Sequence, residues 1–460
     1  MKKEFHFKGL LTENGWLTNV LVSTENGKTT KISPNTDPTT DTHITKGFAL
    51  PGFQNAHSHA FQYAMAGLAE LHEGDGIPDD FWSWRSAMYD LALTLSPEQM
   101  EAIATQLYAE MARHGYTAVT EFHYLHHQPD GTPYAKVAEM GQRLINAAKT
   151  AGIHITLVPM FYQKGGFGIE PTKKQRRFIS PTIEDYYKLL EATKEACTTY
   201  QFASYGMGIH SLRAVQEEDI LKLTSEYDGS IPFHIHVSEQ LKEIEDSINY
   251  YGKRPVQWLL DNVALNENYH LVHATHLDDA EVKGIAKSGA HVVLCPSTEG
   301  NLGDGIFRLH DFKEFGGNWS IGTDSHIGLN PLEELRILDY GQRLITHKRT
   351  SFYQLKQGDS GFNAIKMMWQ SGRKAMGQSA NEFFKIGASF DAVVIDASHP
   401  LLRTSGTKNL CNTIVYAQDV SNIFGTIVNG KWIVFNRDHY NTNIEEQFYE
   451  ILATLKTRNN

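Results

Sequence analysis

The sequence has few cysteines, few prolines, no long apolar run and no excess of positive charge. It contains three cysteines and 15 prolines in 460 residues, with no CxxC pair, which argues against a disulfide scaffold and a thiolate zinc site. No uncharged apolar run approaches the ~18 residues of a membrane span. Lys and Arg total 42 against 53 Asp and Glu, a net charge of −11, so neither nucleic acid nor a membrane is an expected partner.

The remaining composition is that of a folded globular protein with one unusual abundance. Hydrophobic residues make up 41% and charged residues 21% of the chain, unlike a disordered or fibrous protein. The first residues, MKKEFHFKGL, bring Glu4 and His6 before any apolar segment, so we expect no signal peptide and a cytoplasmic location. The abundant side chain is histidine, with 22 residues.

Short apolar runs alternate with helical patterns from about residue 48 to residue 330. The runs are rich in Val, Ile and aromatic residues and too short for typical helices, a pattern typical of parallel strands covered on both faces. Eight strands separated by helices predict an α/β fold, a (β/α)8 TIM-like barrel. A doubly wound open sheet is the alternative, but no GxGxxG motif follows an early strand. The runs are 48–56, 116–122, 154–161, 205–210, 232–237, 270–274, 291–296 and 319–324.

Two helices of this region have clear end signals. Ser96 is a good N-cap and Pro97 suits the first turn. Apolar residues at helical spacing follow, and Gly115 is a plausible stop. A second helix is expected from about Tyr134 to Ala151, ended by Gly152.

Both ends of the chain lie outside this alternation and have β patterns. WLTNVLVST and KTTKIS flank a polar turn near the start, and FDAVVID (390–396), NTIVYA (412–417) and IFGTIVNGKWIVFN (423–436) follow the barrel region. The last segment contains an Asn-Gly pair, typical of a hairpin. We infer a small β-sandwich domain assembled from residues 1–48 and 378–460, and a metal-dependent catalytic barrel over residues 49–377.

Histidines and carboxylates follow several of the expected strands. His57 and His59 end the first run, and residues two apart project to the same side of a strand. The carboxyl ends of parallel barrel strands share one face, where active sites are built. Three imidazoles and one carboxylate suit Zn²⁺ with an open position for water. The other candidate histidines and carboxylates are His236 and Glu239 at the fifth run, His273 at the sixth and Asp324 at the eighth.

At these residues the chain resembles the amidohydrolase superfamily, and most closely its deiminases of N-formimino-L-glutamate. The resemblance implies hydrolysis of that compound to N-formyl-L-glutamate and ammonia, a step of histidine degradation. One departure is Tyr63, where Arg is expected, and it leaves every candidate ligand intact. The resembling segments include NAHSHAFQYAMAGLAE (55–70), FWSWRSAMY (81–89), GIHSLRAV (208–215), HIHVSEQ (234–240), HATHL (273–277), CPSTEGNLGDGIF (295–307) and GTDSHIGLNPLEELRILDYGQRL (322–344).

The resemblance also implies a role for each site residue. His273 would orient the attacking water, Asp324 would accept its proton, and Glu239 would deliver a proton to the imine nitrogen. The fourth run ends in His210 with no adjacent Lys or Glu, which favours one metal ion over two. That ion, one per subunit and expected to be zinc, would be held by His57, His59, His236 and Asp324.

A substrate with two carboxylates needs cations and neutral donors around it. The resemblance implies a homodimer and a substrate site formed by Gln62, Arg85, Tyr124, His210 and Arg213. Two other functions stay open: deamination of a cyclic amidine such as guanine, and a non-catalytic scaffold of the same fold. Among the remaining candidates, Cys295 is expected to be a buried packing residue, and His126 and His127 to be exposed loop residues.

Overall fold

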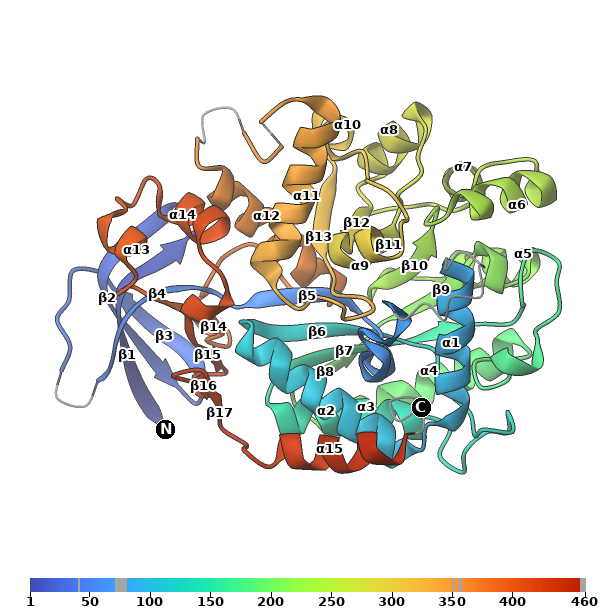
Figure 1. Ribbon diagram of the computed structural model, residues 1–460, viewed down its shortest axis with the longest axis horizontal. Coiled ribbons are helices and arrows are strands. Elements are labelled where there is room, and N and C mark those ends of the chain that lie inside the picture. Colours follow the sequence, from blue (N-terminus) through green and yellow to red (C-terminus); the bar gives the residue numbers. More distant parts are fainter. Residues whose placement is uncertain (40–41, 71–80, 350, 355–357, 456–460) are drawn as a thin grey trace.

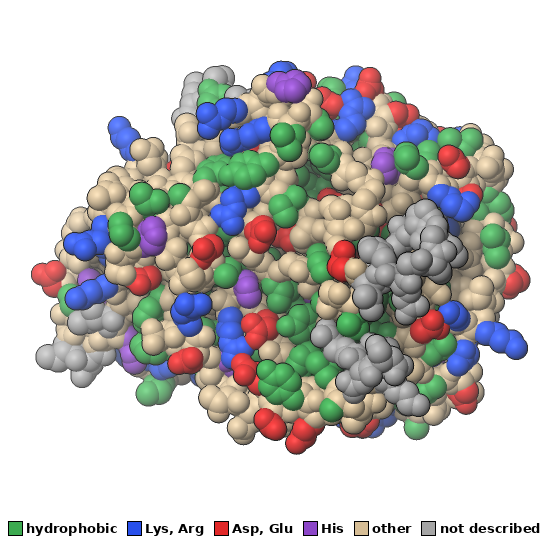
Figure 2. Space-filling model, in the orientation of Figure 1, with side chains coloured by type: hydrophobic (Ala, Val, Ile, Leu, Met, Phe, Trp, Pro, Cys, Tyr) green, Lys and Arg blue, Asp and Glu red, His purple; other side chains and the backbone are tan. Residues whose placement is uncertain are grey.

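The computed structural model describes residues 1–39, 42–70, 81–349, 351–354 and 358–455. Its strands form two sheets, one inside a ring of helices and one at the end of the molecule where the amino-terminal strands lie (Figure 1). No helix within these residues is long and apolar enough to cross a membrane. Figure 2 shows acidic and basic side chains interspersed over one face, without a broad area of a single sign.

In the part of the chain that the structure describes, eight parallel strands follow one another around a barrel, which confirms the predicted fold. The first and last strands meet at a seam just beyond the end of β13. There the N–H groups of Thr323 and Asp324 donate to the carbonyl of His57, at 3.1 and 3.0 Å. The strands, in order, are β5 (Phe53–Ser58), β6 (Tyr116–His123), β7 (His154–Phe161), β9 (Met207–Ser211), β10 (Phe233–Val237), β11 (Tyr269–His273), β12 (His291–Leu294) and β13 (Asn318–Ile321), with β8 (Ala203–Tyr205) beside β7.

Helices cover the outside of the barrel (Figure 1). They are α1 (Phe81–Thr94), α2 (Pro97–Arg113), α3 (Glu139–Ala151), α4 (Ile183–Cys197), α5 (Glu217–Glu226), α6 (Leu241–Tyr251), α7 (Pro255–Asn262), α8 (Asp279–Ser288), α9 (Pro296–Asn301), α10 (Leu309–Glu314), α11 (Pro331–Thr346) and α12 (Ser360–Ala375). Short 3-10 turns are η1 (Ala60–Met65), η2 (Leu68–Glu70), η3 (Lys173–Gln175), η4 (Leu212–Ala214) and η5 (Val420–Asn422).

The end signals of α2 are confirmed, whereas α3 begins later than predicted. Ser96 and Gln99 form a capping box, in which the Gln99 N–H donates to Ser96 Oγ at 3.1 Å and the Ser96 N–H to Gln99 Oε1 at 2.9 Å. Helix α3 starts at Glu139 instead of about residue 134. Tyr134 instead lies in the preceding loop, where its hydroxyl accepts a hydrogen bond from Arg177 at 3.2 Å.

The second sheet combines both ends of the chain. Its turns at Asn26-Gly27 and Asn429-Gly430 have positive φ at both residues, as two-residue type I′ hairpins require. Hydrogen bonds join the described strands in one continuous path, β17-β16-β15-β14-β4-β1-β2-β3. Their bounds are β1 (Lys2–Thr12), β2 (Gly15–Glu25), β3 (Lys28–Ser33), β4 (His43–Pro51), β14 (Ala392–Asp396), β15 (Ile423–Val428), β16 (Lys431–Phe435) and β17 (Asp438–His439).

One predicted strand is a helix. Residues 412–417 belong to α14 (Leu410–Ala417), which buries Leu410, Cys411, Ile414 and Val415 on one helical face. A short apolar run fits a strand or a buried helix equally well, and here packing against α12 and α11 decides. The short α13 (Pro400–Thr404) precedes it, and the last helix, α15 (Ile444–Thr454), packs on α2.

Candidate active site

The strand ends that carry the candidate residues leave the sheet through unusual backbone conformations. Ser238, His273 and Asp324 have φ of 54°, 66° and 50°. Non-glycine residues rarely adopt positive φ, and such strain is concentrated at functional sites. The chain therefore turns sharply where it presents these side chains to the barrel mouth.

Three imidazoles and one carboxylate converge at the mouth, as the sequence predicted. His57 Nε2 lies 3.1 Å from the Nε2 atoms of both His59 and His236. Asp324 Oδ1 lies 3.3 Å from Nε2 of His57 and of His59. All four residues are buried, and their possible ligand atoms lie within 4.8 Å of one another.

The hydrogen bonds behind this cluster fix which nitrogen faces its centre. His59 Nδ1 lies 2.9 Å from the Phe122 carbonyl, and His236 Nδ1 lies 3.1 Å from the His210 carbonyl. A carbonyl oxygen only accepts, so each Nδ1 carries the proton and each Nε2 presents a lone pair. Two lone pairs and a carboxylate oxygen thus point at one position, which is an arrangement for a cation.

The electrostatics of the cluster agree with a cation site. Burial lowers the pKa of His57 to about 3, and burial together with the neighbouring histidines holds the pKa of His236 well below its usual range. Burial opposes the charge of Asp324, but the close contacts of its carboxylate with the His57 and His59 rings hold its pKa well below the ordinary value. Neutral imidazoles and an ionised carboxylate are the forms that bind a divalent metal. The residues therefore fit such an ion.

His273 and Glu239 lie beside the cluster on the next two loops. His273 Nε2 is 3.6 Å from Glu239 Oε1 and 3.8 Å from Asp324 Oδ2, and its Nδ1 is 3.3 Å from Glu299 Oε1. Burial disfavours its charge, but Glu239, Glu299 and Asp324 outweigh burial and raise the pKa of His273 to about 10. This histidine is thus arranged to hold and direct a proton between carboxylates.

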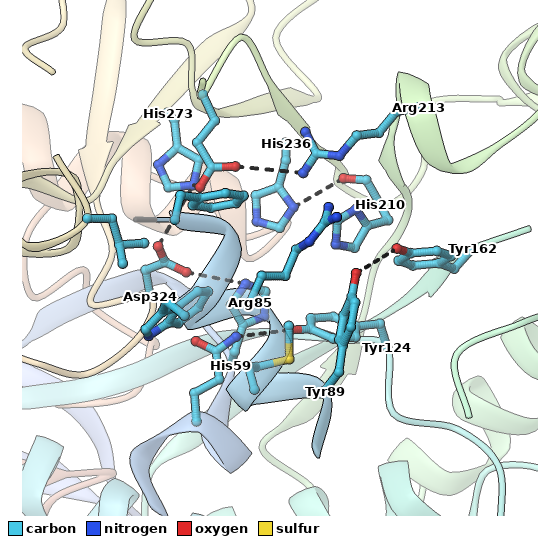
Figure 3. Close-up of a pocket in the computed structure, with 16 residues that line it drawn as sticks. His59, Arg85, Tyr89, Tyr124, Tyr162, His210, Arg213, His236, His273 and Asp324 are labelled. Carbon is cyan, nitrogen blue, oxygen red and sulfur yellow. Dashed lines mark hydrogen bonds and ion pairs between the residues drawn. The ribbon is translucent and has the colours of Figure 1, made fainter. Parts of the chain in front are cut away.

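One cavity joins the cluster to the residues expected to bind substrate. Figure 3 shows Arg85 and Arg213 reaching into it with the histidines and Asp324. Its other polar lining includes an amide and a phenol in contact, because Gln62 Nε2 donates to the Tyr124 hydroxyl at 2.9 Å. The cavity is lined by His59, Gln62, Phe81, Trp84, Arg85, Met88, Tyr89, Tyr124, Tyr162, His210, Arg213, His236, Glu239, His273, Leu302 and Asp324.

The two arginines come from different elements and have different partners. Arg85 projects from α1, and its guanidinium lies 5.6 Å from the centre of the Tyr89 ring one turn further on. Arg213 follows β9, and its guanidinium lies 3.1 Å from Glu243 and 3.8 Å from Glu239. Glu243 also accepts hydrogen bonds from the N–H groups of Ser238 and Glu239, at 3.0 and 3.2 Å. The acid thus anchors both an arginine and the loop that carries Glu239.

Sequence reasoning missed several residues that support the site. Glu243, Glu299, Tyr89 and Tyr162 were not singled out, although Tyr89 follows Arg85 by one helical turn and so shares its face. Glu243 in α6 and Glu299 in α9 contact Arg213 and His273, which are distant in the sequence, so no local pattern reveals these contacts. Cys295 is buried as predicted, and burial raises the pKa of its thiol well above the usual value.

The prediction that His126 and His127 are exposed is wrong. They are only 1% and 8% exposed. Their N–H groups both donate to the carbonyl of Arg177, a residue with no exposed surface, at 3.0 Å. The loop therefore packs around a buried guanidinium, a tertiary contact between distant segments.

A barrel that gathers three histidines and an aspartate at the carboxyl ends of its strands defines the class of metal-dependent barrel hydrolases. Residues 48–433 match the model of the amidohydrolase family. The chain belongs to this family.

Individual relatives agree with the family match. The formimidoylglutamate deiminase of Pseudomonas aeruginosa is 42% identical over 95% of this chain and 96% of that protein. The crystal structure of an amidohydrolase from Brucella melitensis superposes with a TM-score of 0.92 at 39% identity, covering 98% and 99% of the two chains. An adenosine deaminase from Xanthomonas campestris, with bound zinc, shares the fold at a TM-score of 0.79 and 19% identity, covering 98% of each chain.

Proposed function

We propose that the protein hydrolyses N-formimino-L-glutamate to N-formyl-L-glutamate and ammonia. The observation that carries the proposal is one cavity that holds a buried metal-binding group at one side and two arginines, Arg85 and Arg213. An amidine carbon needs a water nucleophile and a proton donor, whereas two carboxylates need cations. The 42% identity to a formimidoylglutamate deiminase over nearly the full length supports the same substrate.

His57, His59, His236 and Asp324 would hold the divalent ion, and three imidazoles with one carboxylate suit zinc. When bound there, such an ion supplies a water whose pKa is lowered to about 7. His273 orients the attacking water and stabilises the charge that develops on it. Asp324 takes up the proton that the water loses.

Glu239 serves the leaving group. Its carboxylate faces His273 and Arg213 inside the cavity, within reach of a substrate nitrogen. Addition of water to the formimino carbon gives a tetrahedral carbon with two nitrogens, and Glu239 delivers a proton to the terminal one. Ammonia then leaves with the proton that Asp324 took up, the hydroxyl proton returns to Glu239 as the C=O bond forms, and N-formyl-L-glutamate remains.

The remaining polar residues would bind the glutamate part. Arg85 and Arg213 pair with its carboxylates, while Gln62, Tyr124 and His210 offer neutral hydrogen bonds. The Tyr124 hydroxyl accepts from Gln62 and donates to Met88 Sδ at 3.7 Å, a weak hydrogen bond that a substrate oxygen would replace. These contacts fix the formimino carbon against the metal-binding group.

The test is ammonia release from purified holoenzyme with N-formimino-L-glutamate and with guanine. Turnover of the first alone supports the proposal, and turnover of guanine alone assigns the protein to the deaminases of cyclic amidines. Metal analysis after purification without chelator separates the two enzymatic functions, formiminoglutamate hydrolysis and deamination of a cyclic amidine, from a non-catalytic scaffold. About one zinc per chain is expected, and a metal-free inactive protein contradicts the proposal.

We also propose that catalysis belongs to the barrel of residues 49–377, because all lining residues of the cavity fall between His59 and Asp324. A composite domain of residues 1–48 and 378–460 would stabilise the barrel without touching substrate. We also propose a homodimer. Exposed apolar side chains on α11, including Tyr340 and Leu344, support it, and light scattering tests it. The buried, unpaired cysteines suit the reducing cytoplasm.

A further inference from the structure

A second cluster of potential metal ligands lies next to the first and shares no residue with it. Glu239, His273 and Asp304 offer ligand atoms that lie within 4.8 Å of one another. They come from the loop after β10, the end of β11 and the loop after α9. All three are buried, with exposed fractions of 6%, 1% and 4%.

Asp304 has a feature that sets it apart from an ordinary structural carboxylate. Its Oδ1 accepts a hydrogen bond from Gln240 Nε2. Its Oδ2 is buried and has no hydrogen-bond partner among the described residues. A buried, unpartnered carboxylate oxygen is costly, so such an atom needs a proton or a cation.

The spacing suits a small divalent ion. Ligand atoms that surround Zn²⁺ tetrahedrally at ~2.0–2.1 Å lie about 3.3–3.4 Å apart. His273 Nε2 and Glu239 Oε1 are 3.6 Å apart, close to that value. Asp304 offers a ligand atom within 4.8 Å of both, so a shift of at most about 1.5 Å would complete the set. Two carboxylates and one imidazole favour zinc over magnesium, which prefers to keep its waters.

A third group, His273 with Cys295 and Glu299, is less suited to an ion. Glu299 Oε1 already accepts from the Cys295 N–H at 2.9 Å and contacts His273 Nδ1 at 3.3 Å. Burial also keeps the Cys295 thiol protonated, because its pKa lies well above the ordinary value. Asp304 brings a buried carboxylate oxygen without a hydrogen-bond partner among the described residues, and Glu299 brings none of that kind.

We propose that Glu239, His273 and Asp304 form a second, weaker zinc site whose occupation inhibits the enzyme. An ion there displaces the proton from His273 Nε2 and engages both His273 and Glu239, the residues that orient the water and deliver the proton. It binds more weakly than an ion in the four-ligand group, because it has one protein ligand fewer. The inhibition rests on the proposed function, whereas the binding of a second zinc does not.

The first test uses wild-type holoenzyme with one equivalent of zinc. Free zinc is raised with metal buffers from about 0.01 to 100 µM, while bound zinc is counted after gel filtration and the initial rate is measured. We expect a second equivalent to bind and the rate to fall at least tenfold in parallel. High substrate concentration should displace the second zinc, because substrate also needs Glu239. Absence of a second equivalent at the highest zinc concentration overturns the proposal.

The second test changes Asp304→Asn, which keeps an oxygen for Gln240 and removes the ligand charge. We expect one zinc to remain bound, turnover at low zinc to stay within about threefold, and inhibition to need at least tenfold more zinc. The control is Asp279→Asn, the same change at an exposed position, which should inhibit like wild type. An unchanged inhibition curve in D304N refutes the site.

A third measurement needs no variant. Cobalt replaces zinc, and its visible absorption reports each tetrahedral site as it fills. A second set of bands, appearing after the first equivalent and removed by substrate, is expected, and a single set contradicts the proposal. If the chain lacks deiminase activity, the metal counts still decide the second site, so the two proposals fail separately.

Discussion

Replacing Arg213 tests whether it binds substrate, provided that its structural role is separated from its binding role. The Arg213 side chain is 12% exposed and pairs with Glu243, which is 1% exposed. Removing one partner of a buried ion pair costs about 3–5 kcal/mol. Unfolding entropy of about 2.1 cal/mol/K per residue gives roughly 1 kcal/mol/K for a chain of this length. We therefore expect Arg213→Met to lower Tm by about 3–5 °C.

The kinetic effect of Arg213→Met has a separate magnitude. A hydrogen bond to a charged group contributes about 1.5–3 kcal/mol. Loss of one carboxylate contact should therefore raise KM about 10- to 150-fold, with a much smaller change in kcat. Ammonia release at several substrate concentrations gives both constants. An unchanged KM refutes the assignment of Arg213 to a substrate carboxylate.

The double variant Arg213→Met with Glu243→Gln separates the two effects. The amide introduced by Glu243→Gln keeps an oxygen for the backbone N–H groups of Ser238 and Glu239 and leaves no buried charge unpaired. Tm should recover most of its loss, while KM stays raised. Recovery of KM together with Tm would show that Arg213 acts only by supporting the loop.

The stability loss of the single variant should depend on pH. Burial raises the pKa of Glu243, and Arg213 opposes that rise. Without Arg213 the folded-state pKa rises further, so the folded protein binds more protons than the unfolded chain above about pH 4.5. Stability then falls as pH rises from there through the raised pKa. The Tm deficit should be larger at about pH 8 than at about pH 5.5, and a deficit independent of pH contradicts this account.

Four further predictions concern the metal-binding group and the residues around it. Glu239→Gln should retain the metal and lose about 100-fold or more in kcat, and a near-normal kcat shows that it is not the proton donor. Gly322→Ala places a Cβ 2.5 Å from His57 Cβ, so metal affinity should fall, whereas Gly406→Ala, with nothing within 4 Å, should not change it. Glu299→Gln keeps an acceptor for the backbone but removes the charge beside His273, so kcat should fall about 10- to 100-fold at constant KM and metal content; full activity refutes this positioning role. Removing the metal by chelation should lower Tm by about 3 °C relative to protein in free metal at 100 times the Kd of the metal. An unchanged Tm contradicts metal binding to the folded state.

The sequence predicted the features that are written into local pattern. The candidate ligands lie at or just after the ends of predicted strands. His57, His59, His236 and Asp324 could therefore be placed on one face of the barrel from the sequence. The Asn-Gly turns and the Ser96 cap were predictable for the same reason, because they need only neighbouring residues.

The remaining features depend on contacts between distant segments. Glu243 and Glu299 are ordinary helix carboxylates in the sequence, and only the fold brings them to Arg213 and His273. The loop of His126 and His127 is buried because Arg177, some 50 residues later, lies inside it. The helix α14 replaced a predicted strand because its apolar residues found a helical partner surface. In each case tertiary packing overrides a local signal.

Closure of the barrel and assembly of the site are one event in this fold. The last strand reaches the first through hydrogen bonds from Thr323 and Asp324 to the His57 carbonyl, and from His59 to the Asp324 carbonyl at 3.2 Å. Three of the four candidate ligands therefore lie on the seam itself, joined by backbone as well as by side chains. A chain whose seam opens loses the ligand geometry, and an ion bound at the seam ties the first strand to the last. Metal binding should consequently stabilise the part of the barrel whose contacts are most distant in sequence, which is where closure costs the most entropy.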